Sequence, residues 1–236
     1  MIDRDAAPRA IIFDMDGLLL DTEVLYTRVQ EQITAEHGGK PFTMQLKSKM
    51  MGQKALDAAK LFVTELGLQD KLTPEAFVAA REVLLDEMFE RETALMPGAE
   101  ALLCRLHESG FPIALATSSH RRHYVLKTSR HRALFDRVFG DRVVTGDEVS
   151  RGKPDKMIFE RAAGLLDVPL EDCVVFEDAV SGVEAAKRGG AVAVMIPDPA
   201  FDRDEYTRTI PYTSGADFVW RSLDEVDLPA LGISLS

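Results

Sequence analysis

The chain has 236 residues, 46% of them hydrophobic and 28% charged, a balance typical of an ordinary globular protein. Its formal net charge of −11 argues against binding to nucleic acid or to an anionic membrane surface. Cys104 and Cys173 have apolar neighbours and no metal-site spacing, which favours buried free thiols in a reducing compartment. The N-terminus lacks the apolar core of a signal peptide, and no run approaches the roughly 18 apolar residues of a membrane span. We therefore expect a cytoplasmic protein without a membrane or nucleic-acid partner.

The first predicted element is a buried strand at residues 10–13, a fully apolar run. The region that follows contains helical stripes and no strand pattern. These stripes run over residues 25–33, 55–66 and 73–89, and Thr73 followed by Pro74 marks the start of the third. We therefore predict an all-helical cap domain over residues 22–92, inserted after the first strand.

From residue 93 onward, apolar runs alternate with helical patterns. The predicted strands are residues 112–117, 142–146, 173–178 and 191–196. The predicted helices cover 99–109, 155–166 and a segment that starts with a capping box at Ser181 and Glu184 and ends at Gly189. This alternation predicts an α/β fold with a doubly wound, Rossmann-like parallel sheet. The core domain is accordingly expected over residues 1–21 and 93–236.

Four segments are expected to bring polar side chains to one edge of this sheet, because the carboxyl ends of parallel strands meet there. The set combines carboxylates, hydroxyls and one ammonium group. It consists of Asp14, Asp16, Thr117, Ser118, Lys153, Glu177 and Asp178. Lys153 would lie just before a helix that begins at Pro154.

The carboxylates of this set predict a magnesium site. Asp14, Asp16 and Asp178, together with a backbone carbonyl, offer the hard oxygen ligands that Mg²⁺ prefers. Glu177 is either a further ligand or a residue that acts beside the ion, and Asp178 is the stronger candidate of the two. The ion and Lys153 would offset the negative charge of a phosphate group that Asp14 would otherwise repel.

The same set also predicts a reaction. Asp14 would attack phosphorus and form an aspartyl-phosphate. Asp16 would act as the acid for the leaving alcohol and then as the base for the attacking water. Thr117 and the backbone N–H groups near Ser118 would bind the remaining phosphoryl oxygens. Ser119 is expected to cap a helix.

The order and spacing of these motifs resemble the haloacid dehalogenase superfamily. The stretches FDMDGLLLDTE, LATSS, GKPDKMIF and FEDAVSGVEAA are similar to its motifs one to four, and the resemblance covers essentially the whole chain. It implies Asp14 as nucleophile, Asp16 as acid/base and Lys153 as the phosphate-binding lysine, with an acidic pair that binds magnesium. The helical insertion resembles the cap of the first subclass of this family.

Substrate choice is expected to come from the cap, with Gln53, Lys54 and Tyr26 as candidates. Asp21 and Thr22 are expected to brace the hinge into the cap. The stretches KSKMMGQKALDAA and LATSS resemble a branch of small-metabolite phosphatases. That resemblance implies pseudouridine 5′-phosphate as the substrate, with glycerol 3-phosphate or another sugar phosphate as the alternative. We expect a monomer whose partner is a small phosphorylated metabolite.

Three other functions are less consistent with the sequence than a phosphatase. The resemblance places Tyr26 where the phosphomutase branch has a histidine, which argues against a phosphomutase. The complete set of chemical groups argues against a non-catalytic binding module. The basic run 120–132 suggests nucleic-acid binding, but a helix at the rim of the site explains it better. In that helix His120 or Arg121 would meet substrate, while the other basic side chains face water or pair with acids.

Overall fold

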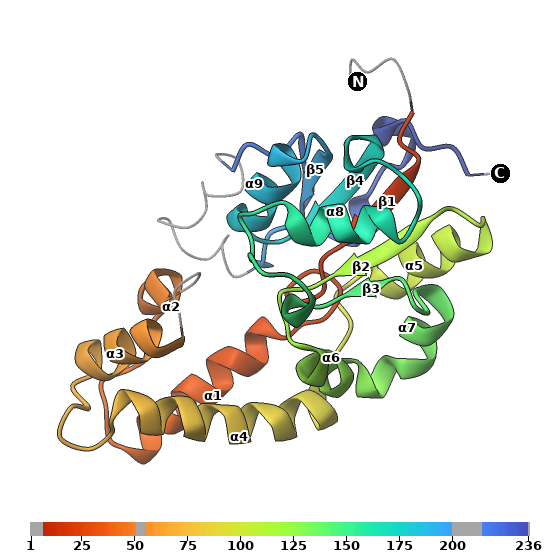
Figure 1. Ribbon diagram of the computed structural model, residues 1–236. Coiled ribbons are helices and arrows are strands. Elements are labelled where there is room, and N and C mark those ends of the chain that lie inside the picture. Colours follow the sequence, from red (N-terminus) through yellow and green to blue (C-terminus); the bar gives the residue numbers. More distant parts are fainter. Residues whose placement is uncertain (1–6, 51–54, 200–213, 236) are drawn as a thin grey trace.

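The computed structural model describes residues 7–50, 55–199 and 214–235 (Figure 1). A sheet flanked by helices forms one part of the molecule, and a group of helices forms the other. Within these residues, no helix is both long and apolar enough to cross a membrane.

The sheet has six parallel strands among the described residues, in the order β3-β2-β1-β4-β5-β6. The strands are β1 (Ala10–Phe13), β2 (Ile113–Ala116), β3 (Val143–Val144), β4 (Cys173–Glu177), β5 (Val192–Met195) and β6 (Phe218–Val219). The predicted doubly wound parallel sheet is confirmed. Sequence analysis missed β6, because two half-buried residues carry no recognisable alternation.

The two faces of the sheet are covered by different helices (Figure 1). Along β1, Ile11 and Phe13 belong to one apolar cluster, whereas Ala10 and Ile12 belong to the other. The first cluster includes residues of α5 (Ala99–Glu108) and α7 (Arg132–Val138), and the second includes residues of α8 (Met157–Gly164) and α9 (Val180–Arg188). Because both faces of the sheet are buried, the sequence of β1 is apolar throughout and does not alternate between apolar and polar residues.

Two predicted helix starts are wrong. The helix α9 begins at Val180, so Ser181 lies inside it and does not cap it. The carboxylate of Glu177 instead accepts hydrogen bonds from the N–H groups of Asp178 and Ala179, 3.1 Å each, just before the helix. The helix α8 begins at Met157, three residues after the predicted start at Pro154. Both segments therefore keep irregular backbone beside the sheet edge, where a ligand can approach.

The region predicted as a cap contains helices throughout its described part. They are α1 (Glu23–Glu36), α2 (Met44–Met50), α3 (Ala55–Glu65) and α4 (Pro74–Glu92). As predicted, Thr73 caps α4 by accepting the N–H of Ala76 at 3.1 Å, with Pro74 in the first turn. The exact boundaries of the cap and core domains remain predictions.

These helices have an apolar core of their own, separate from the two clusters of the sheet. At its centre Phe62 of α3 stacks on Phe77 of α4, with ring centroids 4.0 Å apart and both side chains fully buried. Phe42 packs against Phe62 from a third segment. Aromatic burial of this kind stabilises the packing of the cap helices on one another.

We therefore predict that Phe62→Ala lowers the free energy of unfolding by about 3–5 kcal/mol, because it leaves a cavity in the cap core. Val83→Ala on α4 is the control, since Val83 is 63% exposed and its loss should change stability by no more than about 0.5 kcal/mol. Denaturant unfolding followed by circular dichroism measures both. Equal effects of the two variants would contradict this description of the cap core.

Candidate active site

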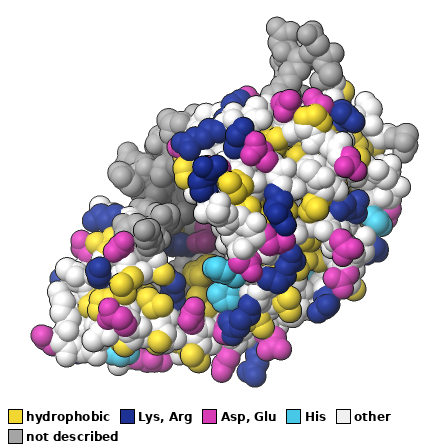
Figure 2. Space-filling model, viewed as in Figure 1, with side chains coloured by type: hydrophobic (Ala, Val, Ile, Leu, Met, Phe, Trp, Pro, Cys, Tyr) yellow, Lys and Arg dark blue, Asp and Glu magenta, His cyan; other side chains and the backbone are white. Residues whose placement is uncertain are grey.

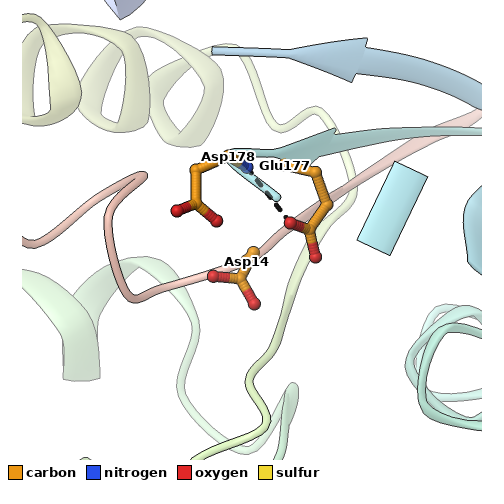
Figure 3. Close-up of side chains that lie close together, drawn as sticks. All are labelled: Asp14, Glu177 and Asp178. Carbon is orange, nitrogen blue, oxygen red and sulfur yellow. Dashed lines mark hydrogen bonds between the residues drawn. The ribbon is translucent and has the colours of Figure 1, made fainter. Parts of the chain in front are cut away.

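Three carboxylates meet at the carboxyl edge of the sheet (Figure 3). Phe13 of β1 is in register with Phe176 of β4, so the residues that follow them, Asp14 and Glu177, come side by side. With Asp178, they form a group whose oxygen atoms lie within 4.8 Å of one another. Three negative charges this close repel one another strongly unless cations offset them.

Lys153 provides one such cation. Its ammonium donates to Asp14 Oδ1 and to Glu177 Oε1, each at 2.5 Å. The Lys153 side chain is 7% exposed, and its ammonium also lies 4.8 Å from the centre of the Phe159 ring. The two carboxylates balance the charge of the buried ammonium, and the ammonium in turn fixes the positions of the two carboxylates.

Asp178 has no such partner. In the described part of the chain no N–H or O–H group donates to its carboxylate, which lies beside those of Asp14 and Glu177 (Figure 3). Burial, followed by the neighbouring charges of Glu177 and Asp14, raises the pKa of Asp178 well above its usual value. Burial also raises the pKa of Asp14 to about 7, even though Lys153 opposes this shift. A divalent cation between Asp14 and Asp178 would remove this repulsion, so the donor set fits Mg²⁺.

The backbone at Gly17 makes this arrangement possible. Gly17 has a φ of +76°, and a Cβ atom there would lie 2.3 Å from Oδ2 of Asp178. Only glycine allows both this backbone conformation and the close approach of the carboxylate. The turn after the first strand is therefore shaped around Asp178.

The carboxylate of Asp16 lies outside this cluster, so its side chain does not join the predicted metal set there. Its Oδ1 atom accepts hydrogen bonds from Thr22 Oγ1 at 2.8 Å and Lys127 Nζ at 2.6 Å. Its Oδ2 atom accepts from Ser119 Oγ at 2.8 Å and Thr117 Oγ1 at 3.3 Å. Burial raises the pKa of Asp16, but Lys127 and the hydroxyl donors outweigh it and leave the pKa below its usual value.

The hydroxyls after β2 thus have different surroundings from those expected. Thr117 is fully buried, donates to Asp16 and is absent from the residues that line the cavity, while Ser118 lines it. Ser119 was predicted to cap a helix, but it does not cap α6 (Arg121–Thr128). Its hydroxyl donates to Asp16 instead. Phosphate binding by Thr117 and Ser118 remains a prediction.

Lys127 is a site residue that sequence reasoning missed. It lies on α6 within the basic run 120–132 and was expected to face water or pair with surface acids, but its side chain is only 1% exposed. Arg122 pairs with Asp86, as expected of the basic residues outside the site. Of the two predicted substrate contacts, His120 lines the cavity, whereas Arg121 pairs with Glu148 and is not among the lining residues. No local pattern separates Lys127 from the other basic residues, because its burial comes from segments distant in the sequence.

A cavity of about 530 Å³ lies between the sheet edge and the cap helices, at the hollow visible in Figure 2. The core contributes Asp14, Asp16, Ser118, His120, Lys153, Glu177 and Asp178 to its lining. The cap contributes Glu23, Tyr26, Gln30, Lys47 and Arg81, among others. Gln53 and Lys54, the predicted substrate contacts, lie outside the described residues.

The comparisons with known proteins agree with this fold. Residues 8–190 match the family model described as haloacid dehalogenase-like hydrolase. The chain is 48% identical to "(DL)-glycerol-3-phosphatase 1, mitochondrial" of Arabidopsis thaliana, over 90% of this chain and 70% of that protein. It is 41% identical to "Probable pseudouridine-5′-phosphatase" of Drosophila melanogaster, over 88% of this chain and 90% of the relative.

A solved structure shares the architecture as well. The crystal structure of a haloacid dehalogenase family hydrolase from Deinococcus radiodurans, with bound phosphate and sodium, superposes with a TM-score of 0.77 at 25% identity, covering 97% of each chain. The family model and the relatives cover most of the sequence. The chain belongs to the haloacid dehalogenase-like hydrolases.

Proposed function

We propose that the chain is a Mg²⁺-dependent phosphatase that works through a phosphoryl group on Asp14. Its family and its relatives make it a phosphoric monoester hydrolase of small phosphorylated metabolites, so the proposal concerns the mechanism and the substrate. The observation that carries it is the position of Asp14, which lines the cavity between Lys153 and the unpaired carboxylate of Asp178.

Asp14 and Asp178 would hold the Mg²⁺ ion, with Glu177 kept beside it by Lys153. When bound, the ion neutralises the carboxylates and polarises the phosphoryl group. Lys153 places a second positive charge at the same point, so a phosphate dianion meets two cations beside the nucleophile. The site can therefore bind an anion although the chain as a whole is strongly acidic.

In the first half of the reaction, a carboxylate oxygen of Asp14 forms a bond to phosphorus while the bond from phosphorus to the ester oxygen breaks. The leaving oxygen takes a proton from Asp16 and departs as an alcohol. In the second half, water attacks phosphorus, its proton passes to Asp16, and the bond between Asp14 and phosphorus breaks. The lowered pKa of Asp16 suits this second half, because it favours the form that accepts a proton.

For the substrate we place glycerol 3-phosphate first, because the relative with the higher identity of the two is named for it. This reverses the order expected from the sequence. Pseudouridine 5′-phosphate is the second candidate, since a cavity of about 530 Å³ is large enough for a nucleotide-sized ligand. A cytoplasmic location remains a prediction, since the name of the Arabidopsis relative places that protein in mitochondria.

The cap side of the cavity supports a substrate with a polar leaving group. Gln30 and Arg81 both line the cavity, and their buried Oε1 and Nε atoms have no hydrogen-bond partner among the described residues. An unpaired buried polar atom costs about 1–3 kcal/mol, which a ligand hydroxyl or carbonyl group would recover. We propose that these two side chains turn to meet the leaving group of the substrate.

Asp14→Asn should lower phosphatase turnover by roughly 1,000-fold or more, because it removes the attacking charge and keeps the shape. Steady-state assays with glycerol 3-phosphate and with p-nitrophenyl phosphate measure this loss. Circular dichroism and thermal melting show whether the variant is folded. A folded variant whose activity stays within tenfold of the wild type would refute Asp14 as nucleophile.

Activity should disappear in EDTA, return with Mg²⁺ and be inhibited by excess Ca²⁺, whose looser coordination spoils the attack geometry. Gly17→Ala should raise the Mg²⁺ concentration needed for half-maximal activity, since its Cβ would displace Asp178. Gly110→Ala is the matched control: Gly110 has a similar φ of +69°, but nothing lies within 4 Å of the added Cβ. Full activity in EDTA, or equal magnesium dependence of the two variants, would contradict the proposed site.

Arg81→Met and Gln30→Leu should lower kcat/KM for the preferred metabolite by about 10-fold each and leave p-nitrophenyl phosphate within about 2-fold, since the aryl ester needs only the core. A panel of phosphorylated metabolites identifies that substrate. Higher kcat/KM for pseudouridine 5′-phosphate than for glycerol 3-phosphate would reverse our order. Conversion of a hexose 1-phosphate to the 6-phosphate without release of phosphate would show that the protein is a phosphomutase and not a phosphatase.

A further inference from the structure

The buried lysine of α6 has an environment unlike that of a surface lysine. Lys127 is 1% exposed, and its ammonium donates to Asp16 Oδ1 at 2.6 Å, Ser119 Oγ at 2.9 Å and Tyr26 Oη at 3.2 Å. An ammonium has three protons, and each has a partner here. A lysine is almost never fully buried unless it is paired, and removal of one partner of a buried pair is costly.

Lys127 holds Asp16 directly and through Ser119. It donates to one oxygen of the carboxylate, while the hydroxyl of Ser119, which accepts from Lys127, donates to the other. Lys127 and Ser119 together therefore hold both oxygens of the carboxylate. Among the described residues, Lys127 is also the one cation within salt-bridge distance of Asp16.

The other side of the ammonium faces the cap. Besides the hydroxyl of Tyr26 on α1, it lies 4.6 Å from the ring centre of Phe89 on α4 and 5.3 Å from that of Tyr26. These two rings pack edge to face, 5.5 Å apart. Lys127 therefore joins a core carboxylate to two cap helices.

Lys127 does not belong to the lining of the cavity, whereas Asp16 and Tyr26 do. An ammonium that does not reach the cavity cannot contact the phosphate as Lys153 does. Its effect on the reaction must pass through the group it holds.

We propose that Lys127 is a positioning residue through which cap helices α1 and α4 orient the carboxylate of Asp16 for proton transfer. This rests on the acid/base role of Asp16 in the proposed function. A carboxylate on a short side chain must point at the leaving oxygen to transfer a proton, and misplacement of about 1 Å costs a large part of the rate. The Tyr26 hydroxyl and the two rings fix the ammonium, which in turn fixes Asp16.

The test compares two leaving groups on one enzyme sample. Lys127→Met keeps an unbranched side chain, one heavy atom shorter, and removes its charge. We expect kcat for glycerol 3-phosphate to fall about 10-fold or more, kcat for p-nitrophenyl phosphate to fall less than about 3-fold, and both KM values to stay within about 2-fold. The ratio of the two kcat values does not depend on the folded fraction, so partial unfolding cannot imitate the result. Parallel losses on both substrates would overturn the proposal.

A double-mutant cycle shows whether Lys127 acts through Asp16. Asp16→Asn alone should lower kcat for the alkyl ester about 100-fold and should affect the aryl ester much less. Adding Lys127→Met to Asp16→Asn should then change the kcat ratio by less than about 2-fold. A further large fall in the ratio would overturn the inference. If Asp16→Asn lowers kcat for both substrates equally, the acid/base role itself fails, and the inference fails with it. If Asp16→Asn lowers kcat more for the alkyl ester but Lys127→Met does not, the inference alone is refuted.

Tyr26→Phe tests the connection to the cap, because it removes the hydroxyl that accepts from Lys127 and keeps the ring. We expect a shift of the kcat ratio in the same direction as Lys127→Met but smaller, about 3-fold. An unchanged ratio would overturn the part played by the cap. Lys156→Met, at an exposed lysine paired with Glu160, is the control and should leave the ratio at the wild-type value.

Discussion

The ion pairs of Lys153 with Asp14 and Glu177 are the interaction on which the rest of the site depends. They join three segments that are far apart in the sequence: the end of β1, the end of β4 and the loop before α8. Without this ammonium, the buried carboxylates of Asp14 and Glu177 and the half-buried one of Asp178 would face one another with no positive charge among the described residues to hold them together. The register of β1 and β4 brings the carboxylates together, and the charge of the lysine offsets their repulsion at this poorly solvated edge of the sheet.

The site uses two buried lysines, and each holds one of the two aspartates that follow β1. Lys153 fixes Asp14 from the core, next to the magnesium ligands that we propose, whereas Lys127 fixes Asp16 at the junction with the cap. The two aspartates therefore experience different surroundings although only one residue separates them. Burial and like charges raise the pKa of Asp14, and Lys127 with its neighbours lowers that of Asp16.

Much of this arrangement could be predicted from the sequence because it follows from local patterns. Apolar runs predicted β1, β2, β4 and β5 to within about two residues, and the parallel topology then placed Asp14, Lys153 and Asp178 at one edge. Lys127 could not be found this way, because its neighbour Asp16 is 111 positions away and its burial is a property of the assembled cap and core. The start of α9 was missed for a related reason: the Glu177 carboxylate accepts the N–H groups of Asp178 and Ala179 just before the helix, and the expected cap, Ser181, lies inside it.

The edge strands of the sheet are much shorter than the inner strands. Its outermost strands, β3 and β6, have two residues each, while the four inner strands have four or five. A long exposed margin would present a row of unpaired N–H and C=O groups to the backbone of another molecule. Two-residue margins offer little length for such pairing, so the apolar inner strands are guarded against edge-to-edge aggregation while the chain is folded.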